Sequence, residues 1–126
     1  MYSKTMLVVR DVPASSAWYQ RLLCLTSGHG GDQFEMLMDG NELVLMLHHF
    51  DAKEHPSIAD SSGTKAGAGV LLYFYADDVD AAYGRALEMN AEVVDEPHVN
   101  EIARQYEFSL KDPDGYALTV CRLRVT

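Results

Sequence analysis

Cysteine is scarce in this sequence, and only Cys24 and Cys121 occur among its 126 residues. The two lie far apart in apolar surroundings without any paired spacing, which excludes a zinc knuckle and a Cys-x-x-Cys redox motif. We therefore expect both to be free thiols buried in the core.

Long apolar runs and basic clusters are also missing. No stretch approaches the roughly 18 apolar residues that a membrane-spanning helix requires, and the N-terminus lacks the basic-then-apolar pattern of a secretory signal. We therefore expect a cytoplasmic protein that does not bind membranes. Lys and Arg total 10 against 19 Asp and Glu, a formal net charge of -9, and this balance argues against nucleic acid as a partner.

The sequence does contain enough apolar residues to form a core, and it contains an internal repeat. Its composition, 48% hydrophobic and 23% charged, suits one domain over residues 1–126. The segment Asp11-Val12-Pro13-Ala14 aligns with Asp78-Val79-Asp80-Ala81, 67 positions later. The two halves of the chain are therefore predicted to share one arrangement of elements.

Hydrophobic periodicity and turn residues give that arrangement. In the first half they predict strands at 5–9, 33–38 and 42–50 and a helix at 13–23; in the second half, strands at 69–76, 106–111 and 116–121 and a helix at 80–89. Short strands near 25–26 and 92–94 would complete βαβββ in each half. The chain then divides into module one (1–50), a polar linker (51–67) that could act as a lid, and module two (68–126).

The helix limits have physical causes. Asp11 and Asp78 can accept hydrogen bonds from unpaired first-turn amides, and Asn90 can take the left-handed conformation that closes a helix. Each helix also carries an apolar stripe at helical spacing that should pack on a sheet. The two stripes are Ala14, Ala17, Trp18 and Leu22, and Val79, Ala82, Ala86 and Met89.

Three segments carry a resemblance to a known family. They are AWYQRLLCL, DDVDAAYGRAL and the closing hairpin YEFSLKDPDGYALTV. Together they resemble the vicinal-oxygen-chelate superfamily of glyoxalases, bleomycin-resistance proteins and extradiol dioxygenases. The resemblance implies an α+β fold in which two tandem βαβββ modules form a curled, barrel-like mixed sheet around a cavity, with the helices outside, and it implies a homodimer. Cys24 stands where the family usually has a glycine after the first helix.

The resemblance also locates the superfamily's metal ligands, which are His or Glu at one inward position of the first and last strands of each module. Counting from Asp11, Asp78 and the turn glycines Gly40 and Gly115 places Lys4, Val44, Leu71 and Thr119 there. Leu and Val have no donor atom, Thr is a weak ligand, and a protonated Lys repels a cation. We therefore expect neither a metal nor another cofactor.

A second group of residues that could bind a metal spans the end of module one and the start of the linker: His48, His49, Asp51, Glu54 and His55. In a strand His48 and His49 point to opposite faces, and at roughly 3.3 Å per residue His48 lies about 13 Å from the expected ligand position in its strand. We interpret these residues as part of the cavity rim and the linker.

Strand alternation then defines the residues that face the cavity. We predict a ligand site made of Lys4, Phe34, Met36, Met46, His48, Tyr73, Tyr75, Glu107, Ser109 and Thr119, with no catalytic residue. Residues of the opposite parity should pack under the helices: Leu7, Val9, Leu43, Leu45, Leu72, Phe74, Tyr106, Phe108, Leu118 and Val120. In two alternatives, the Tyr and Met side chains simply fill a closed barrel, or Lys4 and Glu107 form an internal ion pair.

These features favour a metal-independent protein that binds a small aromatic or cationic molecule. The hairpin YEFSLKDPDG resembles that of the bleomycin-resistance branch, whose acidic, metal-free members confer antibiotic resistance by sequestering a flat cationic antibiotic. An alternative is a superfamily enzyme of the lyase, isomerase or dioxygenase type, with Lys4, Glu107, His48 or Tyr73 as acid or base. A regulatory module with a filled cavity is the third hypothesis.

Overall fold

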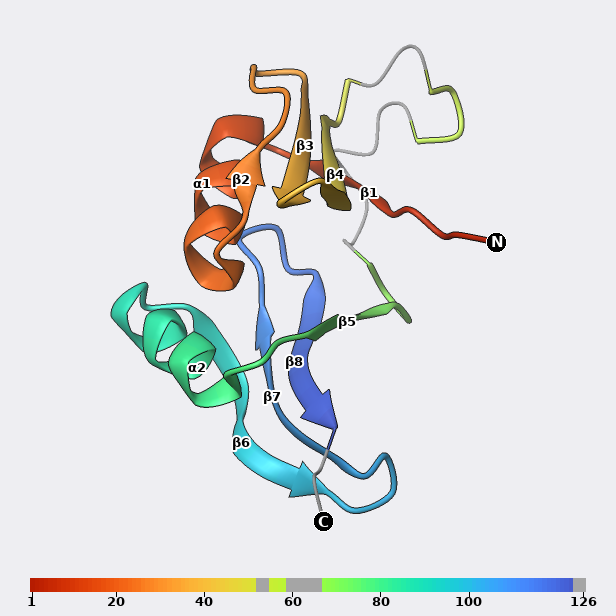
Figure 1. Ribbon diagram of the computed structural model, residues 1–126. Coiled ribbons are helices and arrows are strands. Elements are labelled where there is room, and N and C mark those ends of the chain that lie inside the picture. Colours follow the sequence, from red (N-terminus) through yellow and green to blue (C-terminus); the bar gives the residue numbers. More distant parts are fainter. Residues whose placement is uncertain (52–54, 59–66, 124–126) are drawn as a thin grey trace. The chain divides into compact units, whose positions relative to one another are not determined.

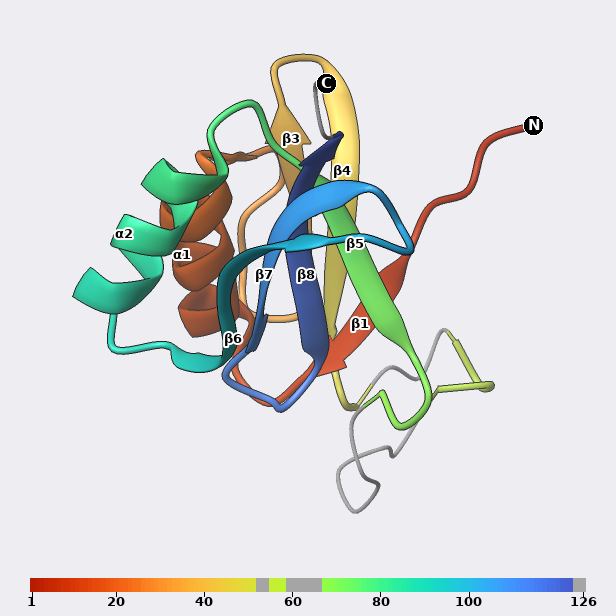
Figure 2. The same ribbon diagram turned by 90° about the horizontal axis from the view of Figure 1, so that it is seen from below.

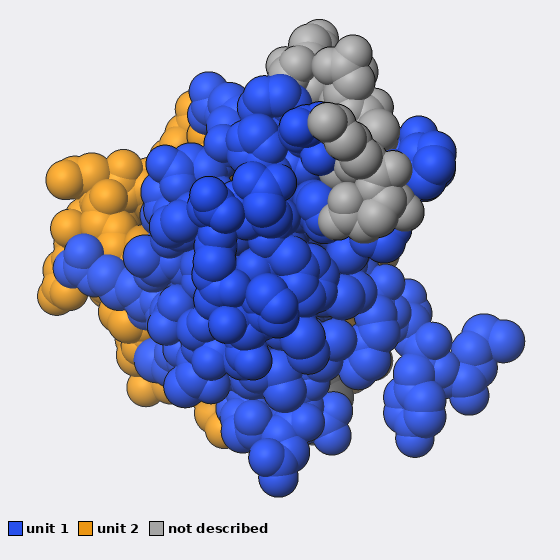
Figure 3. Space-filling view, turned by 90° about the horizontal axis from the view of Figure 1, so that it is seen from above, with its two compact units in different colours: residues 1–64 blue, residues 65–126 orange. Residues whose placement is uncertain are grey.

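The chain forms two compact units, residues 1–64 and 65–126 (Figure 3). A computed structural model describes residues 1–51, 55–58 and 67–123 (Figure 1). Most of the predicted linker, including Glu54 and any lid it might form, lies outside the described residues. Within these described residues, neither helix is long and apolar enough to cross a membrane.

Each unit folds as βαβββ, as the repeat predicts (Figure 1). Unit 1 contains β1 (Met6–Val9), α1 (Val12–Leu23), β2 (Thr26–Ser27), β3 (Phe34–Asp39) and β4 (Glu42–His49). Unit 2 contains β5 (Leu71–Tyr75), α2 (Val79–Glu88), β6 (Glu92–Asn100), β7 (Gln105–Lys111) and β8 (Ala117–Leu123). Of the predicted elements, the strand near 92–94 is the one that extends well beyond its expected bounds.

Each unit has its own four-stranded mixed sheet, with strand orders β1-β4-β3-β2 and β5-β8-β7-β6. The four strands of the second sheet are labelled in Figure 2. The first strand of each unit pairs in parallel with the last, and the other pairings are antiparallel. The predicted α+β fold class and the pair of βαβββ modules are confirmed. The sheets are curled and not closed.

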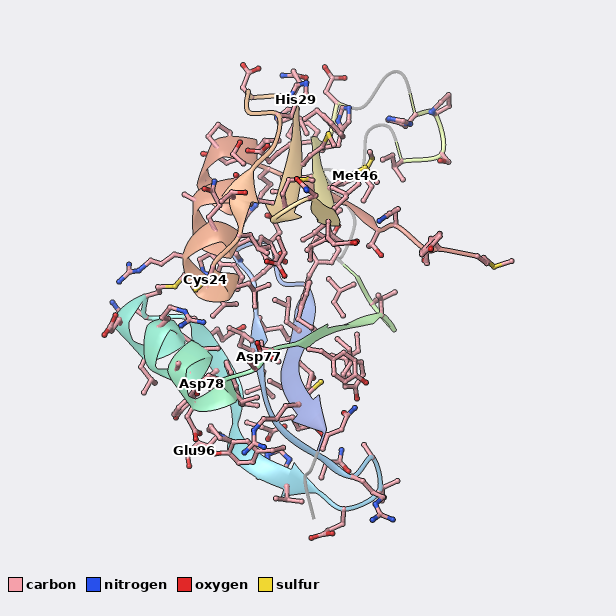
Figure 4. The ribbon with its side chains drawn as sticks, in the orientation of Figure 1. Cys24, His29, Met46, Asp77, Asp78 and Glu96 are labelled. Carbon is pink, nitrogen blue, oxygen red and sulfur yellow. The ribbon has the colours of Figure 1, made fainter. Side chains whose placement is uncertain are left out.

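The repeat includes the hydrogen bond that begins each helix. In α1 the Asp11 carboxylate accepts a hydrogen bond from the amide of Ala14, and in α2 that of Asp78 accepts one from Ala81, both at 3.0 Å. Asn90, at φ 54°, takes the predicted left-handed conformation after α2. The labelled Asp78 marks the start of α2 in Figure 4.

The apolar stripe predicted for α2 is confirmed at Val79, Ala82 and Ala86, which are buried, and Met89 is half-buried. The stripe predicted for α1 is wrong at Ala14 and Ala17, whereas Leu22 is buried and Trp18 is half-buried. Ala14 and Ala17 are exposed, and α1 buries instead Val12, Ser15, Ser16, Tyr19 and Leu22. Two serines lie on the buried face, and one of them, Ser16, donates a hydrogen bond to a carboxylate on the sheet.

The helix-facing side of each sheet forms the core of its unit. In unit 2, Phe108 packs edge-on against the Tyr83 ring of α2, with ring centroids 5.3 Å apart. Leu43, predicted in the same layer of unit 1, is only half-buried, since an irregularity between Leu37 and Met38 shifts the pairing of β3 with β4. The buried strand residues of the two cores are Leu7, Val9, Leu37, Leu45 and Leu47, and Phe108, Leu110, Leu118 and Val120.

A buried carboxylate, which the sequence reading did not identify, ties α1 to the sheet of unit 1. Glu35 is 3% exposed and accepts hydrogen bonds from the hydroxyls of Ser16 (2.8 Å) and Ser27 (2.7 Å). The amides of His29, Gly30 and Met36 donate to its other oxygen at 3.2, 2.8 and 2.9 Å. Burial alone would raise the pKa of Glu35, but these donors lower it to about 2.

Replacement of this carboxylate should therefore weaken the fold in a pH-dependent way. The shift of the Glu35 pKa from 4.5 to about 2 corresponds to about 3 kcal/mol of stability. Because the folded-state pKa is depressed, that stability is present above pH 4.5 and is lost as the pH falls towards 2. We expect Glu35→Gln to lower the free energy of unfolding by about 2 to 4 kcal/mol at pH 7, and by much less near pH 2.

Urea unfolding at both pH values measures this difference, with exposed Glu42→Gln as the control that should change stability by less than about 0.5 kcal/mol. A Glu35→Gln penalty that is equal at pH 7 and pH 2.5 would contradict the account of the charged network.

Cys24 ends α1 in the left-handed conformation, with φ 56° and ψ 43° (Figure 4). The expectation that both cysteines are buried is therefore correct for Cys121 and wrong for Cys24, which is exposed. A left-handed position favours glycine, because a side chain there crowds the following carbonyl. This backbone conformation accounts for the glycine that the family usually has at this place.

We expect Cys24→Gly to raise the free energy of unfolding by about 0.5 to 1 kcal/mol, because it relieves the left-handed strain at a modest cost in unfolded-state entropy. Cys24→Ala keeps a Cβ and serves as the control, with no gain. Equal midpoints for the two variants in urea would show that the conformation is not strained.

Candidate functional site

Each sheet has a second side that its own helix does not cover. In unit 1 this first helix-free face consists of two rows of side chains across β1, β4 and β3. Strand pairing aligns Met6 with Met46 and Met36 in one row. The other row aligns Val8 with His48 and Phe34. The first helix-free face is therefore almost entirely apolar.

The equivalent rows of unit 2 cross β5, β8 and β7 and have different chemistry. One row aligns Tyr73 with Thr119 and Ser109, and the other aligns Tyr75 with Cys121 and Glu107. Gln105 lies on the same side of β7, two residues before Glu107, because side chains alternate along a strand. We call these seven residues the second helix-free face.

The same register corrects one expected ligand position. In unit 2, Thr119 pairs with Tyr73. The counterpart of Tyr73 in unit 1 is Met6, and Met6 pairs with Met46. Val44 lies at the irregularity of β4, so counting from Gly40 selected the wrong residue. The four positions are therefore Lys4, Met46, Leu71 and Thr119. A thioether prefers soft metals such as Cu(I), so these four residues remain poor ligands for a divalent metal ion.

The predicted site residues of unit 1 lie together on β3 and β4. His48 is 1% exposed, its Nδ1 lies 2.9 Å from the His49 carbonyl oxygen, and its ring lies 6.1 Å from that of Phe34. His55 contacts His48 edge-on at 5.4 Å. Among the described residues no group of three His, Cys, Asp or Glu side chains has the arrangement of a metal site.

Lys4 is the exception within unit 1, since it precedes β1 and is exposed. Its ammonium donates to the carbonyl oxygen of Leu43 at 3.3 Å. Glu107, with which it might form an ion pair, belongs to unit 2, so that pairing stays a prediction.

Two buried oxygens on the second helix-free face have no hydrogen bond from any described residue. They are Oε1 of Gln105 and Oε1 of Glu107, in side chains that are 7% and 4% exposed. The Gln105 amide nitrogen donates to the Tyr75 hydroxyl at 2.7 Å, and the hydroxyls of Ser109 and Thr119 hydrogen-bond at 2.8 Å. An unpaired buried acceptor typically costs about 1 to 3 kcal/mol, and more when it is charged. Gln105 was not among the predicted site residues. Its position two residues before Glu107 on the same strand could have placed it on the same face.

The tyrosines on this face are accessible, whereas its floor is not. Tyr73 and Tyr75 are 46% and 65% exposed, while Thr119 and Cys121 are buried. Burial raises the pKa of the Cys121 thiol and the nearby Glu107 carboxylate raises it further. Burial and the proximity of Glu107 likewise raise the pKa of Tyr73. Both groups therefore keep their protons at neutral pH, so neither is primed to act as a base or a nucleophile.

A cavity of about 490 Å³ adjoins one end of this face. It is bordered by Leu71 and Ala117, the row next to Tyr73 and Thr119, by Lys111, and by the turn at Gly67–Gly69. That turn is closed by a hydrogen bond from the amide of Val70 to the carbonyl of Gly67 at 2.9 Å. A Cβ on Gly67 would lie 2.6 Å from the Tyr116 ring, so this position needs glycine.

Comparison with known proteins agrees with this geometry. Residues 2–120 match the family described as the Glyoxalase/Bleomycin resistance protein/Dioxygenase superfamily. No curated protein matches the chain. Three solved structures illustrate the similarity. A glyoxalase/bleomycin resistance protein/dioxygenase family enzyme from Burkholderia phytofirmans PsJN is 23% identical, with a TM-score of 0.78 and 94% of each chain covered.

A protein of unknown function from Agrobacterium tumefaciens C58 is 27% identical, with a TM-score of 0.77 over 97% of this chain and 93% of that one. TioX from Micromonospora sp. ML1 is 15% identical, with a TM-score of 0.72 over 97% and 98%. At this level of identity the first and third show a shared fold, and the second has no stated function.

Proposed function

The chain belongs to the Glyoxalase/Bleomycin resistance protein/Dioxygenase superfamily, and from this premise we propose that it is a metal-independent binding protein for a small aromatic, cationic molecule. The observation that carries the proposal is the second helix-free face, where exposed Tyr73 and Tyr75 stand beside a buried carboxylate, Glu107. Aromatic faces attract planar and cationic groups, and a few fixed polar atoms orient a ligand.

Three further features support the proposal. The adjoining cavity of about 490 Å³ falls within the range of small-molecule sites, roughly 300 to 1,000 Å³. The superfamily's ligand positions hold Lys4, Met46, Leu71 and Thr119, whose chemistry does not suit a divalent metal. The net charge of -9 also favours a cationic partner. Sequestration of an antibiotic or metabolite in the cytoplasm, as in the bleomycin-resistance branch, would need no further chemistry.

Thermal denaturation in the presence of candidate ligands tests this function, since a compound that binds only the folded state raises the melting temperature. We expect bleomycin or a planar cationic dye such as ethidium to raise it, and zinc, nickel, iron(II) and manganese to leave it unchanged. Stabilisation by one of the metals alone would favour the alternative, a superfamily enzyme with a non-standard site.

The tyrosines provide the matched test of location. Stacking on an exposed aromatic ring is worth about 0.5 to 1 kcal/mol, so Tyr73→Ala and Tyr75→Ala should each weaken the binding of a stabilising dye about two- to fivefold in a fluorescence titration. Their melting temperatures should change little, because both side chains are largely exposed. Leu87→Ala, an exposed residue of α2, is the control and should leave affinity unchanged. Unaltered affinity in both tyrosine variants would place the binding site elsewhere.

The proposal includes a homodimer, which the family resemblance implies. Sedimentation velocity at micromolar concentration should then give about twice the chain mass of 14.0 kDa. A single species at the mass of one chain would contradict the dimer and leave the binding proposal intact.

A further inference from the structure

The second helix-free face contains a pair of acceptors that nothing described in the protein satisfies. Oε1 of Gln105 and Oε1 of Glu107 are both buried and without a hydrogen bond. They project from the same side of β7 because they are two residues apart, about 7 Å along the strand. Natural structures rarely leave such atoms unpaired, so an arrangement with two of them side by side points to a missing donor.

The surroundings define the chemistry of that donor. Glu107 is flanked by Cys121 on β8 and by His98 on β6, and the Nδ1 of His98 lies 2.8 Å from the carbonyl oxygen of Glu96. No described residue, His98 included, donates a hydrogen bond to Oε1 of Glu107. The Gln105 amide is held by Tyr75, since its nitrogen donates to the phenol oxygen and leaves the amide oxygen unpaired. One charged and one neutral acceptor therefore lie side by side, next to two aromatic rings.

We propose that Gln105 and Glu107 form the specificity element of this site and select ligands whose cation carries at least two N–H donors, as in an amidinium, guanidinium or primary ammonium group. The inference rests on the proposed binding function and deepens it. A planar amidinium directs two diverging N–H groups at two acceptors and forms charge-assisted hydrogen bonds with the carboxylate. A quaternary ammonium ion has the same charge and no N–H, so it leaves both oxygens unpaired.

Access to these atoms is through the tyrosines. Tyr73 and Tyr75 are the exposed side chains above the buried floor, and an exposed side chain changes rotamer on a picosecond to nanosecond timescale. Rotation of Tyr75 breaks one hydrogen bond, from Gln105, and frees both groups of that amide. The Tyr75 ring, whose hydroxyl accepts from Gln105 in the free protein, can then stack on the bound ligand.

The test compares three ligands that share a naphthyl ring in isothermal titration: 2-naphthamidine, a 2-naphthyltrimethylammonium salt and neutral 2-naphthamide. With the unmodified protein, we expect the amidine to bind at least tenfold more tightly than either of the others. Glu107→Gln should weaken amidine binding at least tenfold and naphthamide binding less than twofold. Glu92→Gln removes the same charge from an exposed site on β6 and should alter amidine binding less than twofold.

A structural role for Glu107 would give a different result. If the carboxylate has no partner in the free protein, Glu107→Gln should melt at the same temperature as the unmodified protein or higher, whereas a structural carboxylate would lower it. Equal affinities for the amidine and the quaternary ion would overturn the proposed selection by N–H donors while leaving a binding site lined by Tyr73 and Tyr75. Failure of all three compounds to bind at millimolar concentration would overturn the binding function itself.

Discussion

The structure depends on one constraint, which is that each four-stranded sheet buries one of its two sides against a single helix. In unit 2 the side chains of Phe108, Leu118 and Val120 are fully buried on that side. Because a strand turns alternate residues to opposite sides, fixing these residues also fixes where Glu107 and Thr119 lie. A slip of one residue would exchange the two sets, so the apolar core holds the polar face in register without contacting its ligand.

Two buried glutamates show how differently the two sides are used. Glu35 faces α1 and receives five hydrogen bonds, which lower its pKa to about 2 and make it part of the fold. Glu107 faces away from α2 and has an oxygen that no described residue satisfies. Burial is nearly equal at the two positions, so the difference lies in the donors around them. A carboxylate that is fully bonded stabilises a fold, whereas one left short of donors is suited to a ligand that supplies them.

Much of this fold could be predicted from the sequence because its strongest signals are local. The repeat, the capping aspartates and the alternation of strands each follow from a few neighbouring residues, and all three agree with the structure. The irregularity in β4 could not be predicted, because it depends on how two strands meet. It moved the expected ligand position from Val44 to Met46 and left Leu43 half-buried.

The buried face of α1 was missed for a related reason. Ser16 is polar, so it is expected at the surface when the helix is considered alone. Its hydroxyl, however, donates a hydrogen bond to Glu35, 19 residues away on the sheet. A pair of complementary polar residues can thus be buried together where either one would be expected at the surface. The side of the sheet on which the predicted strand residues of the site lie follows from parity and agrees with the register, whereas their role in binding stays a prediction. Gln105 was omitted because amide side chains carry no charge signal.

The two helix-free faces also show how one backbone can carry two chemistries. Phe34, Met36, Met46 and His48 occupy in unit 1 the places that Glu107, Ser109, Thr119 and Cys121 occupy in unit 2. All of these side chains lie on the side of the sheet opposite to the helix-facing core, so the two faces can differ in chemistry while that core stays the same. The apolar face has no charge with which to choose among ligands. In the proposed binding function, discrimination among ligands comes from unit 2, where a few polar atoms can be satisfied by the right ligand and are left unpaired by the wrong one.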